Sequence, residues 1–169
     1  MTLSMYQASV PVLSHNLKSL DSILAKAKAH AEAQEIDRAV LLNARLYPDM
    51  FPMLKQVQIA TDIGSRGICR IAGREPESMP DTETTFDELR ARVRHALEQI
   101  ESFRPEQIDG SEQRAIRLKL RNGNEIDFNG QSFLLNFILP NLFFHITTAY
   151  DILRHNGVPL GKSDFLGRG

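Results

Sequence analysis

The sequence predicts a mainly α fold, a four-helix bundle with a β-hairpin inserted before the fourth helix. Four separate segments place apolar residues at alternating three- and four-residue steps, which gives each helix one apolar stripe. Between the last two, at about residues 115–128, apolar and polar residues alternate around Asn122-Gly123, as expected for a hairpin. The 169 residues suit one hydrophobic core, so we expect a single domain over residues 1–169.

Composition excludes several classes of protein. With 42% hydrophobic and 24% charged residues the chain is globular rather than disordered. A formal net charge of -1 supplies no field to collect phosphates, so we expect no nucleic-acid partner. Cys69 is the single cysteine, which excludes an internal disulfide and a multi-thiolate zinc site and favours a cytoplasmic location. The first residues do not resemble a signal peptide.

The first helix is predicted from a stripe that runs through about 22 residues. Ser4 and Gln7 have the spacing of a capping box, in which two side chains satisfy backbone N–H groups at the helix start. Pro11 would leave the carbonyl of Gln7 without its helical partner, so Ser9 is the alternative cap. The stripe consists of Val10, Leu13, Leu17, Leu20, Leu24, Ala27 and Ala31.

The second helix follows a connection over residues 43–52, where two prolines within five residues disfavour helix. Pro52 suits its first turn and Gly73 ends it. Three small residues in the stripe either let a neighbouring element come close or leave room for a bound molecule. The stripe consists of Met53, Val57, Ala60, Gly64, Gly67 and Ile71.

The third helix begins at a second capping box, Thr85 with Glu88, and Pro105 stops it. The hairpin that follows has one apolar face, and an isolated hairpin is marginal in water. We therefore expect that face to cover an end or a side of the bundle.

The fourth helix spans about residues 131–156, closed by Asn156-Gly157. Its apolar stretch, residues 133–146, is interrupted by polar residues and falls short of the roughly 20 residues that span a bilayer, so we expect a buried helix and no membrane partner. Pro140 removes a backbone donor and predicts a kink just before Asn141. The tail, residues 158–169, keeps apolar residues that either fold back over the bundle or reach a second subunit.

One polar cluster lies on the most apolar helix. Asn141, His145 and Thr148 recur at three- and four-residue steps and so share one face. Gln56 on the second helix is a plausible partner for His145 across the interior. The cluster is either a buried hydrogen-bonded network or the floor of a pocket with a metal ion on His145. Asp62, on another edge of the second helix, is either solvated or paired with Arg45 or Arg66.

Three stretches of the chain resemble a known family. These are residues 41–52 (LLNARLYPDMFP), 56–62 (QVQIATD) and 140–161 (PNLFFHITTAYDILRHNGVPLG). They resemble a bacterial family of unknown function within the DinB/YfiT-like superfamily, over nearly the whole chain. The resemblance implies a four-helix bundle with a long crossover between the second and third helices, frequently as a dimer.

The resemblance also implies a candidate metal site. Many superfamily members bind a divalent metal through three histidines, and some transfer a low-molecular-weight thiol to a small electrophile. Those three positions correspond here to His145, to Asn141 and to Gln56 or a neighbour, so His145 is the one retained candidate ligand for zinc or nickel. Amide oxygens are poor donors for either ion, which indicates a degenerate site.

Two hypotheses on function follow. The favoured one is a DinB-like bundle that binds a small molecule in a cleft between the second and fourth helices, with Gln56, Asn141, His145 and Thr148 as the candidate pocket residues. The alternative is a divalent-metal-dependent transferase that uses His145. A homodimer is expected separately, from the superfamily and from the apolar tail.

Overall fold

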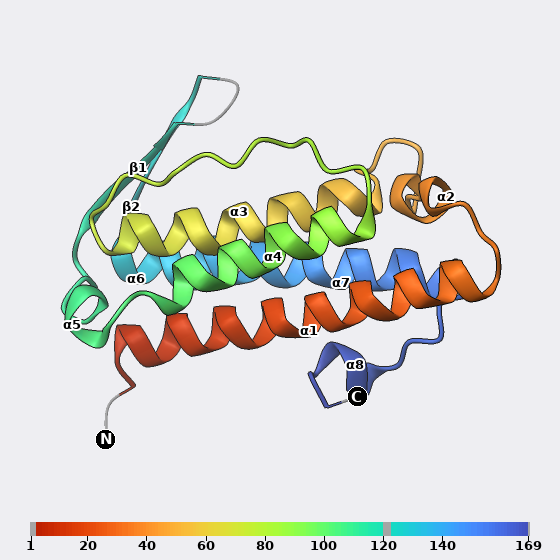
Figure 1. Cartoon of the computed structure of the whole chain (residues 1–169). Helices are drawn as coiled ribbons and strands as arrows, with labels where there is room; N and C mark the ends of the chain where they lie inside the picture. The colour runs from red at the N-terminus through yellow and green to blue at the C-terminus, as the bar shows by residue number, and fades with distance from the viewer. Residues whose placement is uncertain (1–2, 120–122, 169) are drawn as a thin grey trace.

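Four long helical units form the bundle, as the sequence predicts (Figure 1). The computed structural model describes residues 3–119 and 123–168. The units are α1 (Met5–Ala33), α3 (Met53–Ile71), α4 (Phe86–Glu101) and a composite fourth unit made of α6 (Gly130–Phe133), a π-helical turn η1 (Leu134–Ile138) and α7 (Leu139–His155). The expected stripe residues of α1 are all buried and pack against α4, while α3 packs against both α4 and α7.

Three short helices add to this plan and were not predicted. They are α2 (Arg38–Asn43), α5 (Pro105–Ile108) and α8 (Lys162–Phe165). Between α3 and α4 the chain has no helix or strand and runs along the length of the bundle beside both helices (Figure 1). We call this segment, residues 72–85, the crossover. It is the long connection that the superfamily resemblance implies.

Both predicted capping boxes are present. The Ser4 hydroxyl accepts from the backbone N–H of Gln7, whose side chain accepts from the N–H of Ser4. Thr85 and Glu88 make the same reciprocal pair at the start of α4. The alternative cap, Ser9, lies inside α1 and donates instead to the carbonyl of Met5. Local sequence therefore fixes where these two helices begin.

The irregularity predicted at Pro140 takes the form of a π-helical turn. Pro140 has no N–H to donate, and the N–H of Leu139 reaches the carbonyl of Leu134, five residues back, instead of four. The wider turn lies directly before the proline, where the regular ladder would be interrupted in any case. Helical structure thus continues from Gly130 to His155 through the proline, and the kink predicted there stays a prediction.

The hairpin consists of β1 (Ala115–Lys119) and β2 (Glu125–Asn129), paired antiparallel with Ile116 opposite Phe128. Asn122, in the predicted turn, lies outside the described residues, whereas Gly123 is described and has φ +85°. The apolar face covers the start of the fourth unit in part, as expected, with Ile116 buried and Phe128 packed there, whereas Ile126 on the same face is exposed. The ring of Phe128 lies 5.4 Å from that of Phe133 and 5.6 Å from that of Phe137.

The small residues of α3 serve close packing. A methyl group at Gly67 would lie 2.7 Å from the Cδ1 atom of Ile138, and one at Gly64 would lie 3.3 Å from the Cδ1 atom of Ile100. Ile138 belongs to the π-helical turn, so Gly67 lets that turn come against α3. Of the two roles predicted for these residues, the close approach of a neighbouring element is the one observed.

The tail folds back over the bundle, which is the first of its two predicted alternatives. Val158 and Leu160 are buried, and the ring of Phe165 meets that of Tyr150 edge-on. Helix α8 lies beside α1, where Asp164 pairs with Lys26. These contacts cover α1 with the chain's own C-terminal segment.

The continuous helix Gly130–His155 is long and apolar enough to cross a membrane by length and composition, within the part of the chain that the structure describes. Of its most apolar 18-residue window, 39% is buried within the bundle. The helices at the core of folded domains pass the same test. What distinguishes this helix is that much of its apolar surface faces outward.

Candidate functional site

His145 and Gln56 meet across the contact between α7 and α3, as predicted. The Nδ1 atom of His145 lies 2.7 Å from the Oε1 atom of Gln56. The other end of the same amide, Nε2, donates to the backbone carbonyl of Phe51 at 3.0 Å. That second bond fixes the orientation of the amide, so its oxygen must accept from the imidazole. The proton of His145 is therefore on Nδ1 and the lone pair of the neutral ring is on Nε2.

His145 is half-buried, and burial lowers its pKa below the ordinary value of 6.5. The ring of Phe144 stands edge-on to the imidazole at 5.2 Å and adds apolar surface beside it. A neutral imidazole with an anchored Nδ1 proton presents Nε2 as a proton acceptor. The Gln56–His145 pair can thus hold a hydrogen-bond donor, but its anchor is an uncharged amide and not the carboxylate that would strengthen a base.

Asn141 and Thr148 do not join this pair. The Asn141 amide donates to the carbonyl of Phe137 at 2.6 Å, and the Thr148 hydroxyl donates to the carbonyl of Phe144 at 2.7 Å. Both bonds lead to the preceding turn of the same helix, a common arrangement for short polar side chains in an apolar helix. The expected network is therefore correct for Gln56 and His145, and Asn141 satisfies its donor within its own helix.

The residues present do not fit the three-ligand metal site of the resemblance. Gln56 directs its oxygen at the Nδ1 proton of His145, so these two side chains satisfy each other instead of facing a shared ion. Among residues 3–119 and 123–168 no group of three or more His, Cys, Asp or Glu side chains is placed to hold a metal. We accordingly derive no chemistry through a metal at His145.

A cleft opens between α3 and the start of the fourth unit, and we call it the α3 cleft. Its cavity volume is about 280 Å³. Its lining combines charged side chains with apolar ones from α3, from β1 and from the fourth unit, where we call the rings of Phe133 and Phe137 the aromatic floor. The lining consists of Lys55, Gln58, Ile59, Asp62, Ile63, Arg66, Gly67, Arg70, Asp81, Leu118, Lys119, Phe133 and Phe137. This is a cleft between the second and fourth helices of the sequence prediction, but the four predicted pocket residues are not among those that line it.

The guanidinium of Arg92 on α4 lies beside this cleft and is 2% exposed. Its Nη2 atom is 2.7 Å from Asp62 and 3.1 Å from Asp81, and its Nη1 atom is 3.0 Å from Glu83. It also donates to the hydroxyl of Thr61 and to the carbonyl of Pro80, each at 2.9 Å. Asp62 belongs to α3, whereas Asp81, Glu83 and Pro80 belong to the crossover. We call this set the Arg92 cluster.

Burial alone would lower the pKa of Arg92, but the hydrogen bond to Glu83 and the charges of Asp62 and Glu83 outweigh it and raise that pKa. The cation is therefore firmly held, and it ties the crossover to α3 and α4. Of the two arginines predicted as partners for Asp62, only Arg66 is within ion-pair distance. Arg66 is at 3.6 Å, further away than Arg92, while Arg45 donates to the carbonyls of Pro48 and Met50.

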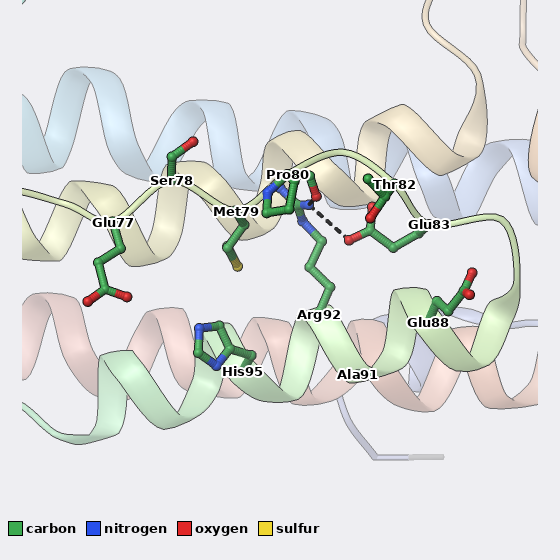
Figure 2. A pocket seen from close by; sticks show the side chains of 10 residues that line it. All are labelled: Glu77, Ser78, Met79, Pro80, Thr82, Glu83, Glu88, Ala91, Arg92 and His95. Carbon is green, nitrogen blue, oxygen red and sulfur yellow. Dashed lines mark hydrogen bonds and ion pairs between the residues drawn. The ribbon is translucent and has the colours of Figure 1, made fainter.

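Figure 2 shows a second cavity, of about 470 Å³, between the crossover and α4. Arg92 and Glu83 reach into it from opposite sides, and His95 and Met79 lie toward one end. Three of its charged groups already have partners, since Arg92 holds Glu83 and Glu88 caps α4. Two further cavities, of about 410 and 340 Å³, lie along α1. The α3 cleft is the smallest of these four cavities, and it differs from the others in being lined by two phenylalanines, whereas one aromatic residue lines each cavity along α1, Phe86 and Tyr6.

Cys69 on α3 is not an activated thiol. Burial raises the pKa of Cys69, and the nearby charges of Arg74 and Arg70 only partly oppose that effect. A nearby arginine favours the thiolate form of a cysteine, but here burial outweighs that effect. The thiolate of Cys69 is therefore disfavoured at neutral pH.

The low pKa of His145 predicts a pH dependence of stability. In the unfolded chain this histidine titrates near 6.5, and in the folded protein it titrates lower, so below pH 6.5 the unfolded state binds more protons. The free energy of unfolding should fall as the pH is lowered from 7.5 to 5, and less so in His145→Gln. Urea unfolding across that range, with proton NMR titration of the ring, measures both.

The exposed His95 provides the control, because His95→Gln should keep the wild-type dependence on pH. A pKa of His145 at or above 6.5, or an equal pH dependence in wild type and His145→Gln, would contradict this account of the site.

Comparison with known proteins agrees with this architecture. A family described as a domain of unknown function (DUF1993) matches residues 5–166. A crystal structure of a DinB family member from Shewanella denitrificans shares 40% sequence identity, with a TM-score of 0.87, over 96% of this chain and 91% of that one. No curated protein matches. The chain therefore belongs to the DUF1993 family and has the DinB-like four-helix fold.

Proposed function

We propose that this protein binds a small organic molecule in the α3 cleft. The observation that carries the proposal is the cleft itself, which is lined by the rings of Phe133 and Phe137 and the side chains of Ile59 and Ile63 together with charged groups. An apolar cavity with a few polar groups around it is the usual form of a ligand site. Its volume, about 280 Å³, lies just below the range of typical ligand pockets, roughly 300 to 1,000 Å³, so it suits a small ligand.

The framework around the cleft is well anchored, which favours binding without a large rearrangement. Phe133 is buried and its ring stacks on that of Phe137 at 5.3 Å. Gly67 holds the π-helical turn against α3, and the Arg92 cluster fixes the crossover at the rim. A ligand would thus enter a cavity whose walls belong to α3, the hairpin and the fourth unit.

This proposal keeps the favoured hypothesis of small-molecule binding but moves the ligand away from His145. The metal-dependent transferase remains without a donor set that fits a metal, so we do not propose it. A cytoplasmic location is part of the proposal, supported by the single, reduced cysteine.

Ligand binding in the α3 cleft is testable with small aromatic probes. We expect at least one of benzyl alcohol, benzoate and benzylamine to shift the ¹³C-methyl NMR signals of Ile59 and Ile63 saturably, with Ile23 in α1 as the internal reference. Ile63→Trp, which fills the cleft, should weaken that binding by about tenfold or more because the probe loses its apolar contact.

The matched control is Ile126→Trp, which adds the same side chain to an exposed position on β2. Absence of any probe response at Ile59 and Ile63, or an unchanged response in Ile63→Trp, would refute the proposal.

We further propose that the protein forms a homodimer through the outward face of the fourth unit. From Gln131 to Tyr150 the sequence has no Asp, Glu, Lys or Arg, and Leu135, Phe143 and Phe144 are exposed, Phe144 by 55%. Homodimer interfaces are more apolar than the rest of a protein surface and depleted in charge. Members of the superfamily that the chain resembles are frequently dimers. We therefore propose that a second copy of the chain covers this apolar face.

Light scattering at micromolar concentration tests this assembly. We expect twice the chain mass of 19.1 kDa for the wild type and a single chain mass for Phe144→Glu, because a charge at the centre of an apolar interface is costly to bury. Ile126→Glu on the hairpin is the control that should stay dimeric. A wild-type mass of 19.1 kDa would refute the dimer.

A further inference from the structure

We propose that the molecule bound in the α3 cleft carries an anionic group, a carboxylate or a phosphate, and that Arg66 and Arg70 hold it while an apolar body lies on the aromatic floor. This inference rests on the small-molecule site proposed above and names the chemistry of its ligand.

Arg66 and Arg70 are placed to act on one ligand. They are four residues apart on α3, so they share a face one turn apart, and both line the cleft. The Nη1 atom of Arg70 donates to the backbone carbonyl of Arg66 at 3.3 Å. The Nε atom of Arg66 is buried and has no hydrogen-bond partner within the described part of the chain. A buried donor without an acceptor is costly. Because this Nε atom is closed off from solvent, an anion in the cleft would meet the exposed part of the Arg66 side chain, which is 37% exposed, unless the guanidinium turns toward it.

The positive charges at this end of the cleft are only weakly compensated, since Arg66 has Asp62 at 3.6 Å and Arg70 has no ion pair among the described residues. Burial lowers the pKa of Arg70, the neighbouring charge of Arg66 lowers it further, and the carboxylate of Glu75 only partly opposes them. Two half-buried cations therefore face the same space. An anion between them would relieve their repulsion as well as their loss of hydration.

The two carboxylates that line the same cleft are already held from elsewhere. Asp62 is 2.7 Å from the buried guanidinium of Arg92 but 3.6 Å from Arg66. Asp81 is paired with both Arg92 and Lys55. Arg92 and Lys55 together thus compensate part of the negative charge of these carboxylates. Arg70, and Lys119 on the hairpin, remain as cations that line it without a carboxylate within ion-pair distance among the described residues.

Guanidinium groups suit this ligand chemistry. Their planar, forked donors match the paired oxygens of a carboxylate or a phosphate, and such charge-assisted bonds are stronger than neutral ones. Apolar side chains line the remaining space, those of Phe137, Ile63 and Leu118. A bare inorganic ion would make no favourable contact with them. The cleft therefore favours an organic anion over either a neutral aromatic molecule or free phosphate.

Titrations of the full chain with five probes, followed at the methyl groups of Ile59 and Ile63, test this. Benzoate and phenyl phosphate carry both features, benzyl alcohol lacks the charge, benzylamine reverses it, and inorganic phosphate lacks the ring. We expect benzoate or phenyl phosphate to bind at least about tenfold more tightly than the other three, and to weaken as sodium chloride rises. The salt dependence needs no variant, so it does not depend on a mutant folding.

Arg70→Met should weaken benzoate binding by about tenfold while leaving benzyl alcohol unchanged. Arg74→Met is the matched control, since Arg74 lies just beyond α3 over the ring of Phe103 and does not line the cleft. It should leave both probes unaffected.

Three outcomes would overturn the inference. If benzyl alcohol or benzylamine bind as tightly as benzoate, the cleft binds small molecules without selecting anions, and the proposed function survives alone. If inorganic phosphate binds as tightly as benzoate, the apolar body is irrelevant. If no probe shifts the signals of Ile59 and Ile63, the proposed function fails as well.

Discussion

The burial of the Arg92 guanidinium among three carboxylates is the interaction on which the rest of the site depends. A cation with 2% exposure is tolerated only if its charge is matched and its N–H groups are used. Arg92 meets both conditions because it forms ion pairs with Asp62 of α3 and with Asp81 and Glu83 of the crossover. The crossover has no helix or strand of its own, so these contacts, rather than a backbone ladder, hold it against the bundle. Removing the cation would leave three carboxylates close together without their shared partner.

The same cluster decides the charge of the α3 cleft. Arg92 pairs with both Asp62 and Asp81, and Lys55 also pairs with Asp81, so the negative charge of these two carboxylates is reduced before any ligand arrives. Arg70, which has no ion pair among the described residues, and Arg66, whose ion pair with Asp62 is long at 3.6 Å, then line the cavity beside an aromatic floor, which is the basis for an organic anion as the ligand. His145 contributes elsewhere, as a neutral ring anchored by Gln56 in the contact between α7 and α3. The Gln56–His145 pair and the charged α3 cleft are thus two separate features, and neither residue of the pair lines the cleft.

How much of this the sequence predicts depends on the range of each interaction. The capping boxes at Ser4 and Thr85 and the apolar stripes follow from spacing within one helix, and all were predicted correctly. The Gln56–His145 pair was predicted because two lone polar groups on apolar faces must find partners. The Arg92 cluster was missed, since its carboxylates lie 9 to 30 residues away and only the folded crossover brings them together. Arg66 and Arg70 at four-residue spacing were a visible signal, but their meaning depends on which carboxylates remain free.

The most direct test of the Arg92 account is the ¹³Cε-methyl NMR signal of Met79 in Arg92→Met. Met79 is half-buried in the crossover beside Arg92, and Met53, buried in α3, reports on the core. Arg90→Met is the matched variant, because Arg90 also lies on α4 but pairs with Asp21 of α1 instead of with the crossover. The account predicts that Arg92→Met moves the Met79 signal to its random-coil position while Met53 stays dispersed, and that Arg90→Met changes neither. An unchanged Met79 signal in folded Arg92→Met would contradict it.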